Sequence, residues 1–205
     1  MEIITIPPRG FASNTYVITL DGKQAIVIDP SQSRAEGELI KLGLEAKYVL
    51  LTHCHFDHVG GVPALQESGA KVLCSSVEKS LTCTETDMHE MYEAPLVYYR
   101  VDDVFEDGEE KILLGMRVKM ILTPGHTKGS ACYLFTTDDG GRYLFTGDTL
   151  FKGSVGRTDF ITGNAEDMRN TIEKLKAIDE DAVVYPGHSY STTLFKEKEE
   201  NPFLK

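Results

Sequence analysis

The chain has 205 residues, of which 41% are hydrophobic and 26% are charged. This length and composition are typical of one globular domain, spanning residues 1–205, that buries enough surface to fold without disulfide bonds. Acidic residues number 32 and basic residues 21, which gives a formal net charge of −11. Because such a protein repels phosphate backbones and anionic lipids, the composition argues against nucleic acid and membranes as partners.

The four cysteines, Cys54, Cys74, Cys83 and Cys132, form no CxxC pair. Scattered thiols are typical of a reducing compartment and argue against a thiolate zinc site. The N-terminus lacks the basic start and apolar stretch of a signal peptide, and no apolar run approaches the ~18 residues that a membrane span requires. We therefore expect a cytoplasmic protein.

The first half of the chain begins with β-rich runs. Strands are predicted over residues 15–20 and 25–28, joined by a turn at Asp21-Gly22, which is a strong hairpin signal. Another strand is predicted over residues 48–51. A helix over residues 33–43, with Ser33 as its N-cap and Gly43 as its end, separates these strands.

A short helix is predicted around residues 63–66, directly after a histidine-rich turn. Residues 76–96 are less regular and could form a helix or a mobile flap. Three large side chains in this region, Met88, Met91 and Tyr92, and Tyr98 directly after it are expected to pack in the core, and the alternative is that they line a flap over a site.

The second half returns to β-structure. Strands are predicted over residues 111–114, 117–122, 131–136 and 142–145, with a tight turn at residues 138–141. Asn164 is expected to cap a helix whose apolar face carries Met168, Ile172, Leu175 and Ile178. A strand over residues 182–185 and a helix capped at Ser191 complete the chain. Two sheets with helices outside, an α/β architecture, accommodate this order.

The segment Thr52–His58 is rich in potential metal ligands. In extended backbone, alternate side chains share a face, so His53, His55 and Asp57 can converge on one point. His58 follows at the turn into the short helix and can reach a neighbouring point, whereas Cys54 should point into the interior. Imidazole and carboxylate are ligands that suit zinc, iron or manganese.

Three more potential ligands follow predicted strands, each directly after a glycine. These are His126, Asp148 and His188. Glycine allows the sharp turn that brings the next side chain to the end of the sheet. Seven ligands are too many for one four-coordinate structural zinc. They fit two adjacent metal ions, with His53, His55 and His126 on one, Asp57, His58 and His188 on the other, and Asp148 between them.

These residues resemble the metallo-β-lactamase superfamily, whose signature is HxHxDH followed by separate His, Asp and His. The resemblance covers nearly the whole chain and implies an αββα sandwich, in which two mixed β-sheets carry helices on their outer faces. It also implies that Asp29, at a strand end, supports the ligand loop without binding metal.

Narrower features are similar to the glyoxalase II group of thioester hydrolases. They are Gly147–Phe151, Ser154–Asp159, Tyr185–His188 and Asn201–Leu204. Full-length members carry an additional C-terminal helical domain that these 205 residues lack, so the resemblance is to the short, single-domain bacterial type. It implies that Arg157, and less directly Lys152, contact the substrate, although Asp159 stands where a tyrosine would be expected.

The resemblance implies two divalent metal ions, with zinc favoured over iron or manganese, and hydrolysis of a small acyl thioester such as S-lactoylglutathione. A hydroxide held between the metals would attack the carbonyl, with Asp57 orienting it. Two alternatives share the fold. One is a persulfide dioxygenase with a single iron on His53, His126 and Asp148, and the other is a lactonase, which needs a tyrosine near the metals.

Overall fold

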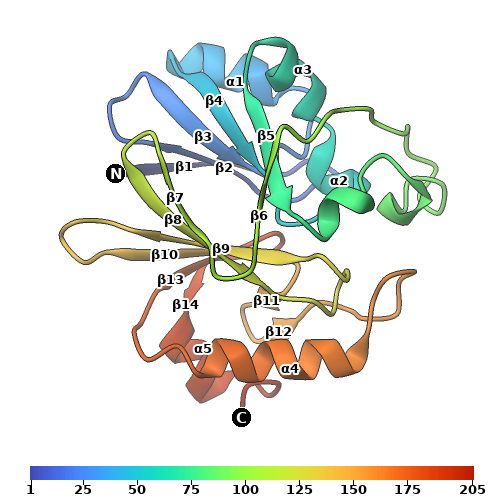
Figure 1. Ribbon diagram of the computed structural model, residues 1–205, viewed down its shortest axis with the longest axis vertical. Coiled ribbons are helices and arrows are strands. Elements are labelled where there is room, and N and C mark those ends of the chain that lie inside the picture. Colours follow the sequence, from blue (N-terminus) through green and yellow to red (C-terminus); the bar gives the residue numbers. More distant parts are fainter.

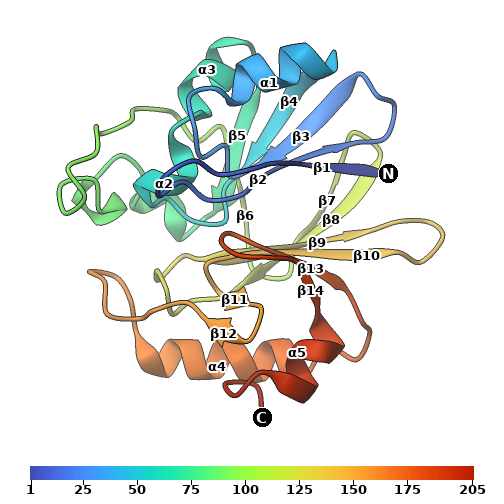
Figure 2. The same ribbon diagram turned by 180° about the vertical axis from the view of Figure 1, so that it is seen from behind.

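The computed structural model describes residues 1–205 as two six-stranded β-sheets packed face to face, with helices on the two outer faces (Figure 1). The expected αββα sandwich of mixed sheets is therefore confirmed. The N-terminal half of the chain builds one sheet and its helices, and the C-terminal half builds the other, as the view from behind also shows (Figure 2).

The first sheet has the strand order β1-β2-β3-β4-β5-β6. The pairs β1–β2 and β2–β3 are antiparallel, and the remaining three pairs are parallel. Its strands are β1 (Glu2–Ile6), β2 (Thr15–Thr19), β3 (Gln24–Ile28), β4 (Glu45–Leu50), β5 (Lys71–Ser75) and β6 (Asp103–Phe105).

The second sheet has the order β14-β13-β10-β9-β8-β7, and its only parallel pair is β10–β13. A separate hairpin of two short strands, β11 and β12, follows β10. The bounds are β7 (Glu110–Leu113), β8 (Met116–Leu122), β9 (Ala131–Thr136), β10 (Arg142–Gly147), β11 (Leu150–Phe151), β12 (Ser154–Val155), β13 (Val183–Pro186) and β14 (Thr192–Thr193).

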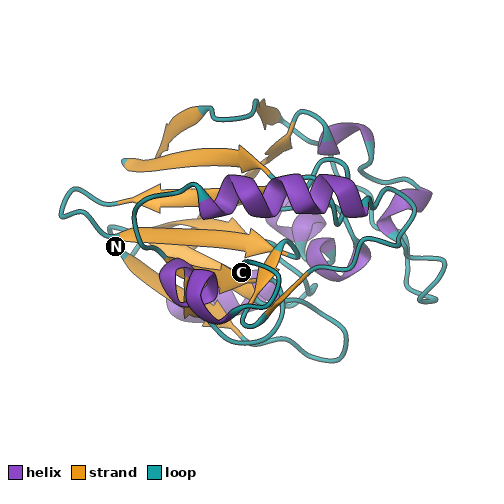
Figure 3. Cartoon of the chain, turned by 90° about the horizontal axis from the view of Figure 1, so that it is seen from below, coloured by secondary structure: helices purple, strands orange, loops and turns teal.

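The helices lie outside the sheets. On the first sheet they are α1 (Ala35–Leu42) and α3 (Val62–Glu67), with the single turn α2 (Phe56–Val59) at the sheet edge. On the second they are α4 (Ala165–Lys176) and α5 (Leu194–Glu200), and the long helix α4 lies in front of the strands in the view from below (Figure 3).

Three layers of core follow from the period-two alternation of the strands. In β3, Ala25 and Val27 belong to the core beneath α1 and α3, whereas Ile26 and Ile28 belong to the core between the sheets. In β9, Leu134 packs towards α4, while its neighbours on either side face the other sheet. Each sheet is therefore apolar on both faces, as a four-layer fold requires.

One edge of the sandwich collects the carboxyl ends of several strands. The strands β3 and β4 are parallel, and so are β10 and β13, while β8 runs in the same direction as β10 because both are antiparallel to β9. The loops that follow these five strands therefore lie at a common edge. Ligands bind at such strand ends in layered α/β proteins.

Hydrogen bonds join the two sheets at this edge. The buried Tyr133 hydroxyl on β9 donates to the carbonyl of Leu51 at 2.9 Å, and the amide of Ala131 donates to the carbonyl of Thr52 at 2.9 Å. On the other side, the Tyr16 hydroxyl on β2 donates to the carbonyl of Pro186 at 2.7 Å. The loops after β4 and β13 are thereby each held by the opposite sheet.

The structure differs from the sequence prediction at two helix starts. Helix α1 begins after Arg34 and receives no side-chain cap, so Ser33 is not its N-cap, although Gly43 ends it with φ 70° as predicted. Helix α5 is capped by Thr193, whose side chain accepts from the amide of Lys196, rather than by Ser191. In both places several consecutive polar residues are possible caps, and the strand or loop that precedes the helix decides which one is used.

Three strands of the first sheet, β1, β5 and β6, had no counterpart in the prediction. The edge strand β6 has only three residues, and it is defined by pairing with β5 rather than by its own pattern. Residues 76–96 form no α-helix; they contain two 3-10 turns, Glu78–Ser80 and Glu85–Asp87, joined by loops. None of the helices has the length and hydrophobicity needed to traverse a bilayer.

The cap of α4 provides a test of the helix on the outer face. The Asn164 side chain accepts hydrogen bonds from the amides of Glu166 and Asp167, as the sequence predicts. We expect Asn164→Ala to lower the free energy of unfolding by about 1 kcal/mol, because two amide donors lose their acceptor. Urea denaturation measures this loss, and an unchanged midpoint would contradict it.

Candidate metal centre

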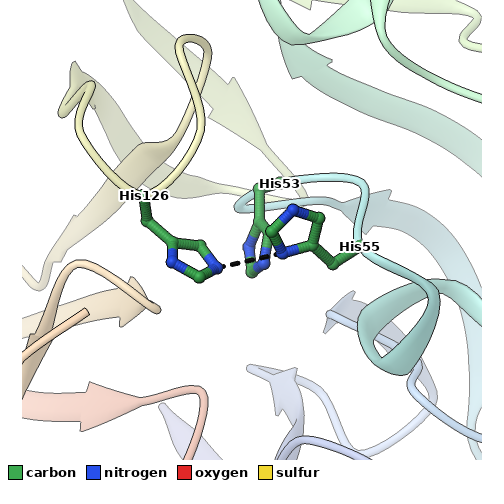
Figure 4. A group of neighbouring side chains, drawn as sticks. All are labelled: His53, His55 and His126. Carbon is green, nitrogen blue, oxygen red and sulfur yellow. Dashed lines mark hydrogen bonds between the residues drawn. The ribbon is translucent and has the colours of Figure 1, made fainter. Parts of the chain in front are cut away.

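The loop after β4 and the loop after β8 bring three histidines together. His53 and His55 come from the first loop and His126 from the second, and one ring nitrogen of each lies within 4.8 Å of the others (Figure 4). His126 Nε2 and His55 Nδ1 are 3.0 Å apart. All three side chains are buried.

A second group lies beside the first. Asp57, His58 and His188 each offer one atom within 4.8 Å of the others. The first two lie on the turn α2, and His188 follows β13. His188 Nε2 is 3.1 Å from Asp57 Oδ2. Asp57 therefore does not join His53 and His55 on one face of an extended segment, because the chain turns into α2 after His55 and points the carboxylate towards His188.

Asp148, directly after β10, lies between the two groups. Its Oδ1 is 3.4 Å from His58 Nε2, and its Oδ2 is 3.6 Å from His188 Nε2 and 3.7 Å from His126 Nε2. One carboxylate thus faces histidines of both groups. The structure brings all seven residues of the sequence prediction into one cluster, in which His53, His58 and Asp148 form a third group of three within 4.8 Å of one another.

Three of the histidines are oriented by hydrogen bonds at Nδ1. His58 donates to Asp29 Oδ2 at 2.9 Å, His126 to the Arg157 carbonyl at 2.8 Å, and His53 to the Thr52 hydroxyl at 3.1 Å. A proton fixed at Nδ1 leaves the lone pair on Nε2, which is the atom that each ring turns towards the cluster. These hydrogen bonds thus fix the orientation of the three imidazoles towards the cluster.

Asp29 organises two of these contacts. Its carboxylate accepts from the Thr52 amide at 2.8 Å, from the Thr52 hydroxyl at 2.6 Å and from His58. The residue is 2% exposed and adopts φ 47°, a left-handed conformation that is unfavourable for most non-glycine residues. Asp29 itself belongs to none of the ligand groups, and its contacts hold the Thr52 backbone and the His58 ring in place.

Several atoms in the cluster lack any hydrogen-bond partner. They include His53 Nε2, His58 Nε2 and Asp148 Oδ1, all buried. Unpaired polar atoms that converge in the interior cost free energy, and a bound cation removes that cost. The donor set is nitrogen and carboxylate oxygen without thiolate, and it suits zinc, iron or manganese. The residues present therefore fit a metal centre.

The protonation states differ among the residues of the cluster. Burial lowers the pKa of His53 far below its ordinary value and that of His55 to about 3, so both rings are neutral at pH 7. Burial acts to raise the pKa of Asp148, but the neighbouring His58 outweighs it and holds the pKa below its ordinary value. Burial acts to lower the pKa of His58, but the carboxylates of Asp57, Asp148 and Asp29 outweigh it and raise this pKa well above its ordinary value, so His58 has to release a proton when it binds metal.

Close approach explains two of the glycines before ligands. A Cβ on Gly187 would lie 2.3 Å from Asp148 Oδ1 and 2.8 Å from the His58 ring. Gly147 has φ 48°, and a Cβ there would lie 2.2 Å from the Thr52 hydroxyl. Both positions lie at the contact between the two halves of the site, where there is no space for any side chain.

A cavity of about 510 Å³ opens onto the cluster. Its polar lining includes His55, Asp57, His126, Asp148 and His188, and its apolar lining is Phe11, Phe56, Met88, Tyr92, Phe151 and Phe160. This volume is in the usual range for small-molecule sites. Core packing was the expected role of four side chains in residues 76–98. Met88 is buried as expected and also lines the cavity, whereas Tyr92 lines the cavity with 39% exposure, and Met91 and Tyr98 are exposed at 66% and 72%.

Arg157 and Lys152, the two residues predicted to contact the substrate, lie in different places. Arg157 lines the cavity, but its guanidinium makes a two-pronged contact with Asp159 at 2.6 and 2.7 Å and lies over the Phe160 ring at 4.2 Å. Hydrogen bonds from Arg157 lower the pKa of Asp159 to about 2, so the pair is ionised at neutral pH. Lys152 is exposed on the β11–β12 turn and does not line the cavity.

Sequence reasoning missed one buried acid, Glu78. Its side chain accepts from the amide of Cys54, between the two histidines of the first loop, and from the Thr127 hydroxyl, next to His126, both at 2.8 Å. Burial raises the pKa of this carboxyl, and its hydrogen bonds oppose the rise. Glu78 thereby ties together the two loops of the first histidine group. A lone Glu in an irregular segment carries no motif, so no signal in the sequence identifies it.

Comparison with known protein families matches residues 8–188 to the family described as the metallo-beta-lactamase superfamily. Among curated relatives, hydroxyacylglutathione hydrolase GloC of Haemophilus influenzae is 33% identical and covers 100% of this chain and 98% of its own. The probable polyketide biosynthesis zinc-dependent hydrolase BaeB of Bacillus velezensis is 35% identical over 82% of this chain and 68% of its own.

Several solved structures have the same fold as this chain. The B3 metallo-beta-lactamase BLEG-1 superposes with a TM-score of 0.90 at 28% identity, and both chains are covered completely. The protein TTHA1623, in a di-iron-bound form, gives 0.82 at 30% identity, again with complete coverage. The protein ETHE1 of Myxococcus xanthus gives 0.77 at 29% identity, covering 98% of this chain and 84% of that one.

The role of Glu78 can be separated from general stability. We expect Glu78→Gln to lower the free energy of unfolding by about 1–3 kcal/mol, because an amide NH2 would replace an oxygen that accepts a buried hydrogen bond. We also expect weaker metal binding, because the loops of His55 and His126 are no longer held together. Urea denaturation and competition with a chelator measure the two effects.

Glu197 offers a matched control. It is 2% exposed and accepts hydrogen bonds from Thr192 and from the Gly153 amide, away from the histidine cluster. We expect Glu197→Gln to lower the free energy of unfolding by a similar amount but to leave the affinity for metal unchanged. Equal loss of metal affinity in both variants would show that Glu78 acts only through overall stability.

Asp29 is expected to act on metal affinity through His58 and Thr52. In Asp29→Asn the side chain tolerates the left-handed backbone but loses one accepting oxygen. We expect metal affinity to fall by about 10- to 100-fold, the usual effect of removing a partner of a ligating histidine. A chelator titration measures this, and a variant with unchanged affinity would disprove the supporting role.

Proposed function

Because this chain belongs to the metallo-beta-lactamase superfamily and is a metal-dependent hydrolase of it, we propose that it uses two metal ions to hydrolyse acyl thioesters of the S-lactoylglutathione kind. The observation that carries this proposal is the pair of adjacent ligand groups that share Asp148. A structural site with one metal would need neither the second group nor a cavity that opens onto it.

In this proposal the two metals have separate ligand sets. His53, His55 and His126 hold one ion, and Asp57, His58 and His188 hold the other, with Asp148 between them. Three protein ligands on each side leave positions open, which is the mark of a catalytic site. Metal ions bound there would lower the pKa of coordinated water to about 7 and act as Lewis acids towards a carbonyl.

The chain's own residues position the reaction. The Asp57 carboxylate lines the cavity beside His188 and can accept a hydrogen bond from the attacking water, which orients it towards the substrate. The hydrogen bonds from His53, His58 and His126 to the protein keep the ligands from rotating. A thiolate is a good leaving group, so the reaction requires less help from a general acid than amide hydrolysis does.

The choice of thioester rests on the relative GloC, which is named hydroxyacylglutathione hydrolase and matches this chain over its full length. Zinc is proposed because the relative BaeB is named a zinc-dependent hydrolase. Iron is the alternative, since the similar protein TTHA1623 was solved with two iron ions. The ligand types tolerate both metals.

A persulfide dioxygenase remains the second candidate. It is favoured by the likeness to ETHE1 at a TM-score of 0.77, and it would use a single iron on His53, His126 and Asp148. In that case Asp57 and His188 would have no metal to bind. Their placement with His58, within ligand distance of one another, supports the two-metal hydrolase instead.

The first test is elemental analysis of protein purified without added metal, combined with an assay of S-lactoylglutathione hydrolysis. We expect two metal ions per chain and hydrolysis that a chelator abolishes. His188→Ala should retain fewer ions and lose activity by at least about 100-fold. His89→Ala, which changes the one histidine outside the cluster, should retain both ions.

Other results of these measurements would assign the protein a different activity. One iron per chain, no thioester hydrolysis and oxygen consumption with a persulfide would replace the proposed function with the dioxygenase. Two metals with cleavage of a β-lactam but of no thioester would assign the protein an activity like that named for BLEG-1.

A further inference from the structure

The cavity at the metal centre has an aromatic wall, made of Phe11, Phe56, Tyr92 and Phe160. The Phe56 and Tyr92 rings are stacked with centroids 5.0 Å apart, and Phe11 lies 6.1 Å from Tyr92. Phe160 continues the wall to the cluster, since its ring centroid is 5.5 Å from that of His55 and 5.8 Å from that of His126. An unbroken apolar surface thus runs from the cavity mouth to the metal ligands.

Part of this wall is left open to solvent. Phe11 is 76% exposed and Tyr92 is 39% exposed, although both line the cavity. Single exposed aromatic residues are common on protein surfaces, but aromatic residues from four separate segments that gather on one cavity mark a ligand site. A bound apolar group would cover the wall and gain the free energy of its own burial.

The cavity offers little to an anionic substrate. Arg157 is the only Lys or Arg among its lining residues, and two of its guanidinium nitrogens, Nε and Nη2, already donate to the Asp159 carboxylate. The other charged lining residues, Asp57 and Asp148, are carboxylates. Glutathione carries two carboxylates of its own, and neither would meet a free cation on this wall.

We propose that the aromatic wall selects acyl thioesters with an apolar acyl group, and that a charged thiol such as glutathione is not required. This inference rests on the proposed thioester hydrolysis and names its substrate class. The apolar acyl chain would lie against Phe56, Tyr92 and Phe160, with its carbonyl at the metal ligands.

Hydrolysis of matched substrates tests the preference. The probes are lactoyl, butanoyl and hexanoyl thioesters of N-acetylcysteamine, a small neutral thiol, and the same acyl groups on glutathione. We expect kcat/KM to rise by about tenfold from butanoyl to hexanoyl, as two methylenes are buried. We expect glutathione to give no advantage over N-acetylcysteamine. Faster hydrolysis of the lactoyl thioesters than of the hexanoyl thioesters would overturn the proposal, and so would a clear preference for glutathione over N-acetylcysteamine.

Substitutions in the aromatic wall test whether it causes the dependence on acyl length. Tyr92→Ala should remove the dependence on acyl length, and Tyr92→Phe should retain it, because the ring rather than the hydroxyl makes the apolar surface. Tyr98→Ala is the matched control, since Tyr98 is 72% exposed and lies outside the cavity. If Tyr98→Ala and Tyr92→Ala change the dependence equally, the wall is not its cause.

Binding of stable analogues separates this inference from the proposed function. S-hexyl and S-methyl thioethers of N-acetylcysteamine cannot be hydrolysed, and calorimetry measures their affinity for the metal-loaded protein directly. Tighter binding of the S-hexyl compound, lost in Tyr92→Ala, supports the wall even if no thioester is cleaved. Equal binding of both compounds overturns the wall even if thioesters are cleaved.

A further test concerns the ion pair between Arg157 and Asp159. Asp159→Asn frees the guanidinium without altering the aromatic rings. We expect this variant to gain kcat/KM towards glutathione thioesters relative to the neutral ones, because the freed Arg157 can then bind a carboxylate. Unchanged selectivity in Asp159→Asn would contradict the argument that the ion pair excludes anionic thiols.

Discussion

The buried carboxylate of Asp29 is the contact on which the metal centre depends. It lies where β3 ends, accepts two hydrogen bonds from Thr52 at the end of β4, and accepts a third from His58 on α2. Through Thr52 it also orients His53. One side chain therefore fixes ligands of both proposed metal sites against a single strand end. The strained backbone of Asp29, at φ 47°, is retained because these three bonds compensate for it.

The second half of the chain is attached to this arrangement by contacts across the sandwich. Glu78 holds the first ligand loop to the loop of His126, and Tyr133 and Ala131 bind the same region from β9. Gly147 and Gly187 allow the loops of Asp148 and His188 to approach without side chains between them. The ligands of one cluster thus come from both sheets, and each sheet depends on the other to place them. Such pre-organisation limits the cost of ordering ligands when metal binds.

Above the ligands, the same geometry separates two tasks. In the proposed function, the buried cluster would provide polar groups for chemistry, and the aromatic wall that lines the same cavity would provide apolar surface for recognition. Arg157 connects the two, because its carbonyl orients His126 while its guanidinium is held by Asp159 over Phe160. A change in substrate preference can therefore arise in the wall or in this ion pair without disturbing the ligands. This arrangement agrees with the general finding that one fold serves many functions through its loops.

The sequence by itself predicted the seven candidate ligand residues, and it determined the sandwich and most strand positions, since motif spacing and apolar alternation are local patterns. It also identified Asp29 through its place in a strand-end motif. Tertiary structure alone decided that Asp57 turns away from His53, that Glu78 joins two ligand loops, and that Tyr92 lines the cavity rather than the core. Short strands such as β6 likewise exist only because a neighbour pairs with them. The physical reason is the same in each case: these features depend on contacts between segments distant in sequence, and no local pattern encodes such contacts.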